Sequence, residues 1–228
     1  SHTKKSTLPV LSITEAESSN KLLPLTVYSF KGASYHEKFP VSKLTSPNNE
    51  VFCTNYSDSE FIFQHLHEKI MLIKSVTVHS KFKPLGSYGY PIGSGLIFTS
   101  MHLSDFSTTS RFSEMKHQDF NKWYKERIQQ NSELEPWEPV GSFEFDEKSE
   151  SLTVDLKYTR ACKYILLKPT SMRSKPENYT SYFKVSPIEI RFFGASGTII
   201  EQEPSSILPE KKPAILNFKD AEITVEGC

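Results

Sequence analysis

Two segments of the chain gather basic, aromatic and amide side chains, and these residues are the first candidates for chemistry. The first segment carries Lys81, Lys83, Tyr88 and Tyr90, and the second carries Arg173, Lys175, Asn178, Tyr179 and Tyr182. Tyrosine and arginine supply a large contact area with a polar tip at modest ordering cost. We interpret both segments as loops that bind a partner, with Arg173 and Lys175 pairing with anionic groups. The alternative is that both loops are solvated and their tyrosines pack against the rim of the domain.

The charge distribution around the second segment suggests a partner class. Residues 160–191 hold seven Lys or Arg and two Glu, whereas Lys+Arg and Asp+Glu balance at 27 each over the whole chain. A local excess of positive charge favours an acidic or phosphorylated protein segment. The alternative is that lysines on strands simply face water. The overall balance argues against a nucleic-acid binder whose affinity rests on net charge.

Other reactive residue types do not form a recognisable catalytic or metal-binding set. His65 and His67 would share one side of a strand, but a third metal ligand is not evident near them in the sequence. Cys162 lies in an apolar stretch, where a small buried residue is the ordinary interpretation. The Gly-rich stretch 86–95 lacks the Lys-Ser/Thr of a phosphate-binding loop. We therefore expect no metal, no cofactor and no catalytic residues; an unrecognised hydrolase is a remote alternative.

The cysteines bear on the compartment. Cys53, Cys162 and Cys228 are widely spaced and form no CxxC pair, which is typical of reduced intracellular thiols. We predict a location in the cytoplasm or nucleus, although Asn55 and Asn178 match the glycosylation acceptor pattern. The chain lacks a run of 18 apolar residues, so we predict no membrane span. It begins Ser-His-Thr, which we read as a remnant of tag removal on a fragment of a longer protein.

The elements that must position these loops are predicted to be strands. The chain has 16 Phe, 10 Tyr and only 9 Gly, a composition that leans towards sheet. Short apolar or alternating stretches predict strands at 22–30, 51–57, 60–66, 70–82, 96–103, 140–146, 152–158, 163–169 and 187–194. The charged turn 147–151 predicts that 140–146 and 152–158 form a hairpin. Four Gly and two Pro predict a long loop over 83–95.

One amphipathic helix interrupts the strands. Phe120, Trp123, Tyr124 and Ile128 follow helical spacing, and Asp119 could cap the helix. A single apolar stripe on a charged helix predicts that it lies across an end or a face of the sheet. Many short strands, long loops and one inserted helix indicate an antiparallel β-sandwich.

The last predicted strands resemble a known family. The stretch "TRACKYILLKPTSMR", a loop, and then "SPIEIRFFGASG" are similar to the end of discoidin-type, galactose-binding-like domains, which include DOC-type domains of ubiquitin-ligase complexes. The shared positions are Ala161, Tyr164, Ile165, Leu167, Pro169 and Thr170, then Ile188, Glu189, Ile190, Phe192, Phe193 and Gly194. The resemblance implies a jelly-roll sandwich whose loops at one end bind sugar, lipid head group, peptide or nucleic acid. The sequence has Ala195 after Gly194, so the terminal disulfide of extracellular relatives is not expected.

These observations give one expected organisation and several functions. We expect a flexible arm over residues 1–20, a β-sandwich recognition domain over 21–200 and a linker or extension over 201–228. The leading interpretation is a non-catalytic module of a larger protein that binds a protein partner, such as a substrate or adaptor in a ubiquitin-ligase complex. The alternatives are a lectin-like domain that binds carbohydrate or a lipid head group, and a structural scaffold whose contact face surrounds Trp123.

Overall fold

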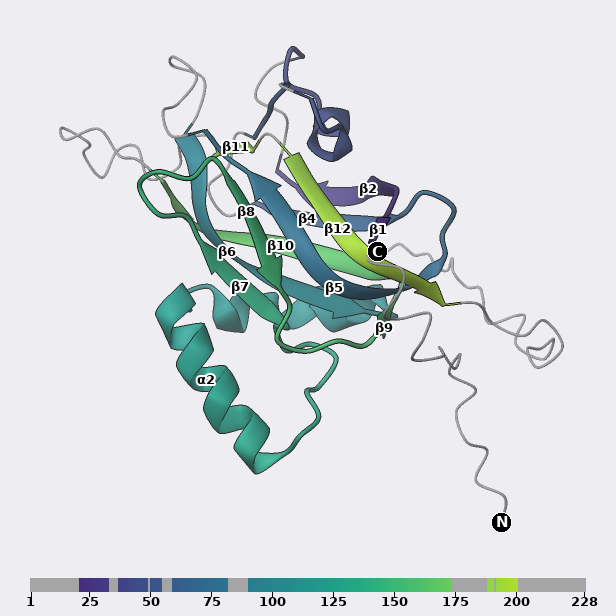
Figure 1. Ribbon diagram of the computed structural model, residues 1–228, viewed down its shortest axis with the longest axis vertical. Coiled ribbons are helices and arrows are strands. Elements are labelled where there is room, and N and C mark those ends of the chain that lie inside the picture. The colour runs from purple at the N-terminus through teal and green to yellow at the C-terminus, as the bar shows by residue number, and fades with distance from the viewer. Residues whose placement is uncertain are drawn as a thin grey trace, which may run out of the picture.

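In the computed structural model, two β-sheets pack face to face (Figure 1). The structure describes residues 21–32, 37–48, 50–54, 59–81, 90–173, 188–190 and 192–200. Sheet A contains β1 (Lys21–Leu22), β5 (Ile70–His79), β8 (Ser151–Asp155), β9 (Ala161–Cys162) and β12 (Phe192–Ile200). Sheet B contains β2 (Leu25–Lys31), β3 (Phe52–Thr54), β4 (Glu60–His65), β6 (Tyr90–Ser100), β7 (Gly141–Glu144), β10 (Tyr164–Met172) and β11 (Ile188–Ile190). The predicted antiparallel β-sandwich is confirmed; β11 and β6 form one parallel pair within it.

The core lies between the sheets and is rich in aromatic residues. Phe63 of β4 and Phe193 of β12 come from opposite sheets, and their ring centroids lie 4.3 Å apart in a stacked arrangement. Alternate residues of each strand point to this core because side chains of a strand alternate between its two faces. Val76 and Val78 of β5 follow this rule, and both are buried.

A second apolar cluster covers the outer face of sheet B. Leu96, Phe98 and Leu166 point away from the sandwich and are buried against Phe112 and Phe120. Phe112 belongs to the 3-10 helix η2 (Leu103–Phe112), and Phe120 belongs to α2 (His117–Gln130). The central strands β6 and β10 are therefore apolar on both faces, which explains the continuous runs "LIF" and "ILL" in the sequence.

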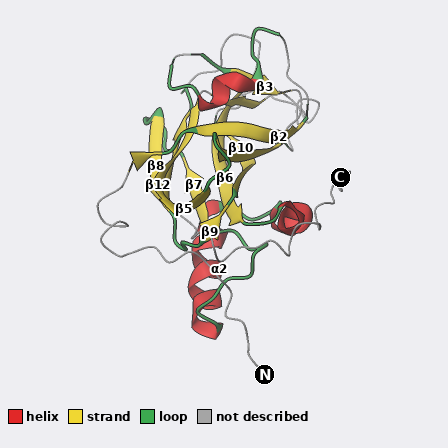
Figure 2. Cartoon of the chain, turned by 90° about the vertical axis from the view of Figure 1, so that its right-hand side faces the viewer, coloured by secondary structure: helices red, strands yellow, loops and turns green. Residues whose placement is uncertain are grey.

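Helix α2 packs through Phe120 against this outer cluster, and Figure 2 shows the helix extending below the strands. Phe120 is fully buried, and the Tyr124 hydroxyl donates a 2.8 Å hydrogen bond to the carbonyl of Lys157. The helix begins at His117, two residues before the predicted cap. Asp119 acts in the first turn instead, where its carboxylate accepts from the Lys116 N–H at 3.2 Å. The prediction that α2 lies on a face of the sheet is confirmed. Among the described residues, no helix is long and apolar enough to cross a membrane.

Two strand predictions are wrong. Residues 140–146 and 152–158 do not form a hairpin, because β7 pairs with β6 in sheet B and β8 pairs with β5 in sheet A. The charged turn between them carries the chain from one sheet to the other. The predicted loop 83–95 also ends early, since β6 begins at Tyr90.

The glycines of β6 explain the second error. A Cβ at Gly93 would lie 2.8 Å from the backbone of Met172, and one at Gly95 would lie 2.8 Å from the Phe143 ring. These glycines therefore allow neighbouring strands to approach closely rather than marking a turn.

The smaller elements complete the sandwich. The 3-10 helix η1 (Val41–Thr45) contributes the buried Leu44 to the core. The chain also changes sheet between β11 and β12, since Ile190 pairs in sheet B and Phe192 in sheet A. The predicted arm 1–20 and extension 201–228 lie outside the described residues.

Candidate ligand-binding trough

The structure brings two of the predicted binding residues to the same turn. Lys81 Nζ lies 3.5 Å from Glu150 Oε1, and Arg173 donates to the carbonyl of Asp146 at 2.9 Å. Both contacts involve the turn between β7 and β8. Tyr90 is the first residue of β6. The other predicted residues lie outside the described ranges: Lys83, Tyr88, Lys175, Asn178, Tyr179 and Tyr182. Of the predicted binding residues, the structure therefore describes only Lys81, Tyr90 and Arg173, which lie at the ends of the two loops.

The chain itself engages the Arg173 guanidinium. Besides Asp146, it donates to the carbonyl of Ser80 at 2.8 Å, and its central carbon lies 4.8 Å from the centroid of the Phe145 ring. Burial lowers the pKa of Arg173 below its usual value. Arg173 thus connects the ends of three segments, and these contacts occupy donors that an anionic partner would need.

Two other cations of the basic stretch are also engaged inside the domain. Arg160 donates to backbone carbonyls of Thr99, Leu134, Glu135, Pro136 and Glu138. Lys168 is buried, and its Nζ lies 2.8 Å from Glu60 Oε2, which also accepts from Thr109 of η2. Within the described part of residues 160–191, Arg160, Lys168 and Arg173 therefore contact groups of the domain itself. These three side chains do not form a basic face.

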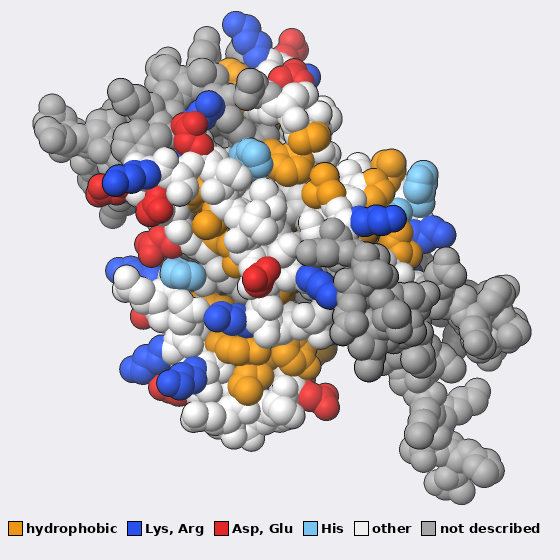
Figure 3. Space-filling model, in the orientation of Figure 1, with side chains coloured by type: hydrophobic (Ala, Val, Ile, Leu, Met, Phe, Trp, Pro, Cys, Tyr) orange, Lys and Arg blue, Asp and Glu red, His pale blue; other side chains and the backbone are white. Residues whose placement is uncertain are grey.

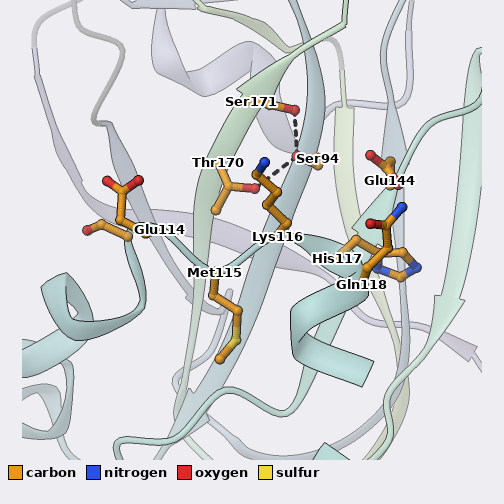
Figure 4. A pocket seen from close by; sticks show the side chains of 10 residues that line it. Ser94, Glu114, Met115, Lys116, His117, Gln118, Glu144, Thr170 and Ser171 are labelled. Atoms are coloured by element: carbon orange, nitrogen blue, oxygen red, sulfur yellow. Dashed lines mark hydrogen bonds between the residues drawn. The ribbon is translucent and has the colours of Figure 1, made fainter. Parts of the chain in front are cut away.

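A polar hollow of about 420 Å³ lies where the η2–α2 turn meets the ends of β6, β7 and β10 (Figure 4). Ser94 is its buried centre: its Oγ lies 2.9 Å from Thr170 Oγ1 and 2.5 Å from Ser171 Oγ. The β10 register shifts between Pro169 and Met172, which brings both hydroxyls to the same side as Ser94. The result is a fixed group of three hydroxyls at the base of the hollow.

Charged and amide groups surround these hydroxyls. Glu114, Met115, Lys116, His117 and Gln118 come from the turn and from the first residues of α2. Glu144 faces them from the end of β7, since it pairs with Ser94 in the register. The arrangement presents carboxylate acceptors, ammonium and amide donors, and hydroxyls that do both.

A second hollow of about 280 Å³ adjoins the first and shares Glu144 and Ser171 with it. Its other lining residues are Gly93, Phe145, Asp146, Glu147, Met172 and Arg173. We call the two hollows together the polar trough. The trough ends at Arg173, so it reaches the rim where the sequence placed the partner.

The histidine in the trough has a neighbour at each ring nitrogen. His117 Nδ1 lies 2.6 Å from Ser142 Oγ, and the Asn121 amide nitrogen lies 3.4 Å from His117 Nε2. Both ring nitrogens of His117 are therefore engaged in contacts within the chain.

His65, His67 and Cys162, which the sequence offered as reactive residues, do not form a metal-binding or nucleophilic site in the described structure. His65 is buried, and its Nδ1 accepts from the His67 N–H at 2.9 Å. Burial raises the pKa of the Cys162 thiol to about 12, which keeps it protonated at neutral pH. Within the described residues, no three His, Cys, Asp or Glu side chains are grouped to hold a metal ion.

Sequence reasoning missed the trough. Ser94 and Gly95 fell in the predicted loop 83–95, and the predicted strand 163–169 stopped before Thr170 and Ser171, although all four belong to long strands. A detectable signal was the run of hydroxyl residues at 170–171 directly after an apolar strand. Nothing in the sequence joined it to residues 113–118. These residues belong to the segment 103–138, which we call the helical insert and which folds over sheet B through η2 and α2.

Comparisons with known proteins give structural similarity only. No family model and no curated protein sequence matches the chain. The chain is similar to the C-terminal domain of a chitobiase from Bacteroides fragilis, at 14% identity and a TM-score of 0.47, covering 79% of this chain and 100% of that one.

Two carbohydrate-binding modules show the same degree of similarity. One is the family 32 module of NanJ from C. perfringens, in complex with galactose, at 12% identity and a TM-score of 0.46, covering 77% of this chain and 97% of that one. The other is CBM32-3 of a family 31 glycoside hydrolase from Clostridium perfringens, at 9% identity and a TM-score of 0.48, covering 82% and 100%. The resemblance to galactose-binding-like, discoidin-type domains predicted a sandwich of two sheets, and the described strands form one.

Proposed function

We propose that the chain is a non-catalytic binding module whose polar trough holds a carbohydrate. This is the reading that the sequence left as the alternative, and it replaces the ubiquitin-ligase adaptor as the leading function. The ubiquitin-ligase reading gains no support from the similar structures named above. The expectation of an acidic or phosphorylated partner depended on basic residues that the domain engages internally, among them Arg160, Lys168 and Arg173.

The proposal rests on the three hydroxyls of Ser94, Thr170 and Ser171, which contact one another. Hydrogen-bond donors and acceptors of several kinds surround them in the hollow. A sugar presents many hydroxyls, each both donor and acceptor, so it is matched by a surface that offers both kinds of group. Met115 adds one apolar contact for the ring carbons. The volume of about 420 Å³ lies within the ~300–1,000 Å³ usual for small-molecule sites.

The chemistry of the trough favours binding over turnover. Both ring nitrogens of His117 lie within hydrogen-bond distance of a neighbour, and the Cys162 thiol lies outside the trough, fully buried, with its pKa raised to about 12. The pKa of Asp146 is lowered by hydrogen bonds from the Ser149 and Lys148 N–H groups, so this carboxyl is a poor proton donor at neutral pH. These groups give the trough a hydrogen-bonding role.

A matched pair of variants tests the proposal on an array of neutral and acidic glycans. Gln118→Ala and Gln129→Ala remove the same side chain from exposed positions of α2, but only Gln118 lines the trough. We expect the wild-type chain to retain a defined set of glycans, Gln118→Ala to weaken that binding about three- to tenfold, and Gln129→Ala to leave it unchanged. Absence of glycan binding by the wild-type chain, or equal loss in both variants, contradicts the proposal.

A further inference from the structure

We propose that the trough selects neutral saccharides and rejects acidic ones, such as uronates and phosphorylated sugars. This inference rests on the carbohydrate function proposed above and concerns which sugars the trough accepts. It is the reverse of the preference for an acidic partner that the sequence suggested.

Carboxylates outnumber cations along the trough. The lining residues include Glu114, Glu144, Asp146 and Glu147 against Lys116 and Arg173. Glu144 matters most because it belongs to both hollows and faces the hydroxyl group at Ser94. A ligand seated on these hydroxyls therefore lies next to a carboxylate wherever it extends along the trough.

The two cations do not offset these carboxylates equally. Arg173 donates to the carbonyls of Ser80 and Asp146 and lies over Phe145, so the chain already uses its guanidinium. Lys116 is exposed and is the remaining cation of the described lining. An exposed ammonium on a flexible stem is screened by water and contributes little to a fixed anion site.

The amino end of α2 also points toward the first hollow, and a helix amino end attracts negative charge. Here that attraction is partly satisfied by the chain, because the Asp119 carboxylate accepts from the Lys116 N–H at 3.2 Å. Asp119 thus places a negative charge next to Lys116, which lines the first hollow. The balance of charges around the ligand remains negative.

Asp146 stays ionised over the physiological range. Its carboxylate accepts from the Lys148 N–H at 2.8 Å and from the Ser149 N–H at 2.7 Å, and these bonds lower its pKa. These bonds direct the carboxylate to its own turn, so it repels an anionic ligand without binding a neutral one. Glu144 and Glu114 are exposed and able to accept from sugar hydroxyls.

The test compares each neutral sugar with the uronate of the same ring: galactose with galacturonate, glucose with glucuronate, and mannose with mannuronate. Binding is measured by titration calorimetry with the full chain at low ionic strength, where charge effects are largest. We expect at least one neutral sugar to bind about tenfold or more tightly than its uronate. Removing two carboxylates, with Glu114→Gln plus Glu144→Gln, should reduce this ratio to about threefold or less.

The control is Glu126→Gln plus Glu133→Gln. This pair removes two exposed carboxylates, one on α2 and one just after it, which do not line the trough. It should leave the ratio of neutral-sugar to uronate affinity unchanged. A uronate that binds as tightly as its neutral sugar overturns the charge selection but leaves carbohydrate binding standing. A ratio that changes equally in both double variants also overturns it, since the effect would then come from net charge. If no neutral or acidic sugar binds, the proposed function itself is wrong.

Discussion

The outer faces of the two sheets differ, although both belong to the same sandwich. On sheet B, Leu96, Phe98 and Leu166 are buried beneath the helical insert. On sheet A, the corresponding face carries Thr77 and Thr153, whose hydroxyls lie 2.9 Å apart at an exposed position. Figure 3 views the molecule from the same side as Figure 1, where charged, polar and apolar side chains are interspersed.

The difference shows what the insert adds. A sandwich needs one buried face per sheet, and the main core of sheet A lies on the face toward sheet B, although Phe192 is also buried outside that core cluster. The insert gives sheet B a second core, and its turn at 113–118 forms one wall of the polar trough. On sheet B, the same insert therefore contributes both to stability and to the proposed binding site. Sheet A contributes to stability, and the trough is not on it.

The largest expected change in stability distinguishes the outer face of sheet B from that of sheet A. Phe98→Ala removes a fully buried ring that contacts Phe112 of η2 at a centroid distance of 5.8 Å, and it should lower the free energy of unfolding by about 3–5 kcal/mol. Thr153→Ala on sheet A should lower it by less than about 1 kcal/mol. Urea denaturation of both variants checks this, and similar losses would mean that the insert is not a second core.

A smaller loss is expected where the trough meets the sheet. A Cβ at Gly95 would lie 2.8 Å from the Phe143 ring and 2.9 Å from the Lys168 carbonyl. Gly95→Ala should therefore lower the free energy of unfolding by about 1–3 kcal/mol and also weaken glycan binding, because Ser94 is the preceding residue. Urea denaturation and calorimetry measure the two effects. A variant with wild-type values for both would show that this strand contact is not tight.

Arg160 holds the end of the insert against the sandwich by hydrogen bonds to its backbone carbonyls. Arg160→Lys keeps the charge but loses the planar donor group that reaches carbonyls of residues 134–138, and should lower the free energy of unfolding by about 1–2 kcal/mol. The same change at exposed Arg111 is the control and should have almost no effect. Equal urea midpoints for the two variants would contradict this role.

The smallest effect is a pH dependence from His65. Burial lowers its pKa, so in the folded state His65 is neutral where an unfolded histidine, with a pKa of about 6.5, is already protonated. The unfolded state then binds more protons, and stability falls as pH drops below about 6.5. Urea midpoints from pH 7.5 to 5 should fall less steeply in His65→Gln than in the wild type.

Exposed His102 provides the control for this slope. His102→Gln should keep the wild-type pH dependence. Some slope should remain even in His65→Gln, because burial also lowers the pKa of His79. An unchanged slope in His65→Gln would contradict the assignment of the effect to His65.

Local patterns predicted the strands and the helix but not how they combine. The alternation in β5 and the stripe of Phe120 and Tyr124 are properties of single elements, and they were identified correctly. The β7–β8 connection looks like a hairpin in sequence, but the partners of β7 and β8 are β6 and β5. Sheet membership depends on residues far along the chain, so a turn pattern does not determine it.

The candidate site failed to appear in the sequence for a related reason. Arg173 was predicted to pair with an anionic group of a partner, but its guanidinium is engaged by carbonyls that local patterns do not reveal. The trough combines β6, β7, β10 and the turn before α2, and each contributes ordinary serine, threonine or glutamate residues. Such residues become a site only through the register that places Ser94 beside Ser171 and Glu144.

Backbone amide NMR during titration with the tightest-binding neutral glycan tests the central claim most directly. The account predicts that the largest shift changes fall on Ser94, Glu144, Ser171 and residues 114–118, while Thr77 and Thr153 on sheet A do not move. Changes centred on sheet A, or spread evenly over both faces, would contradict the assignment of the trough as the ligand site.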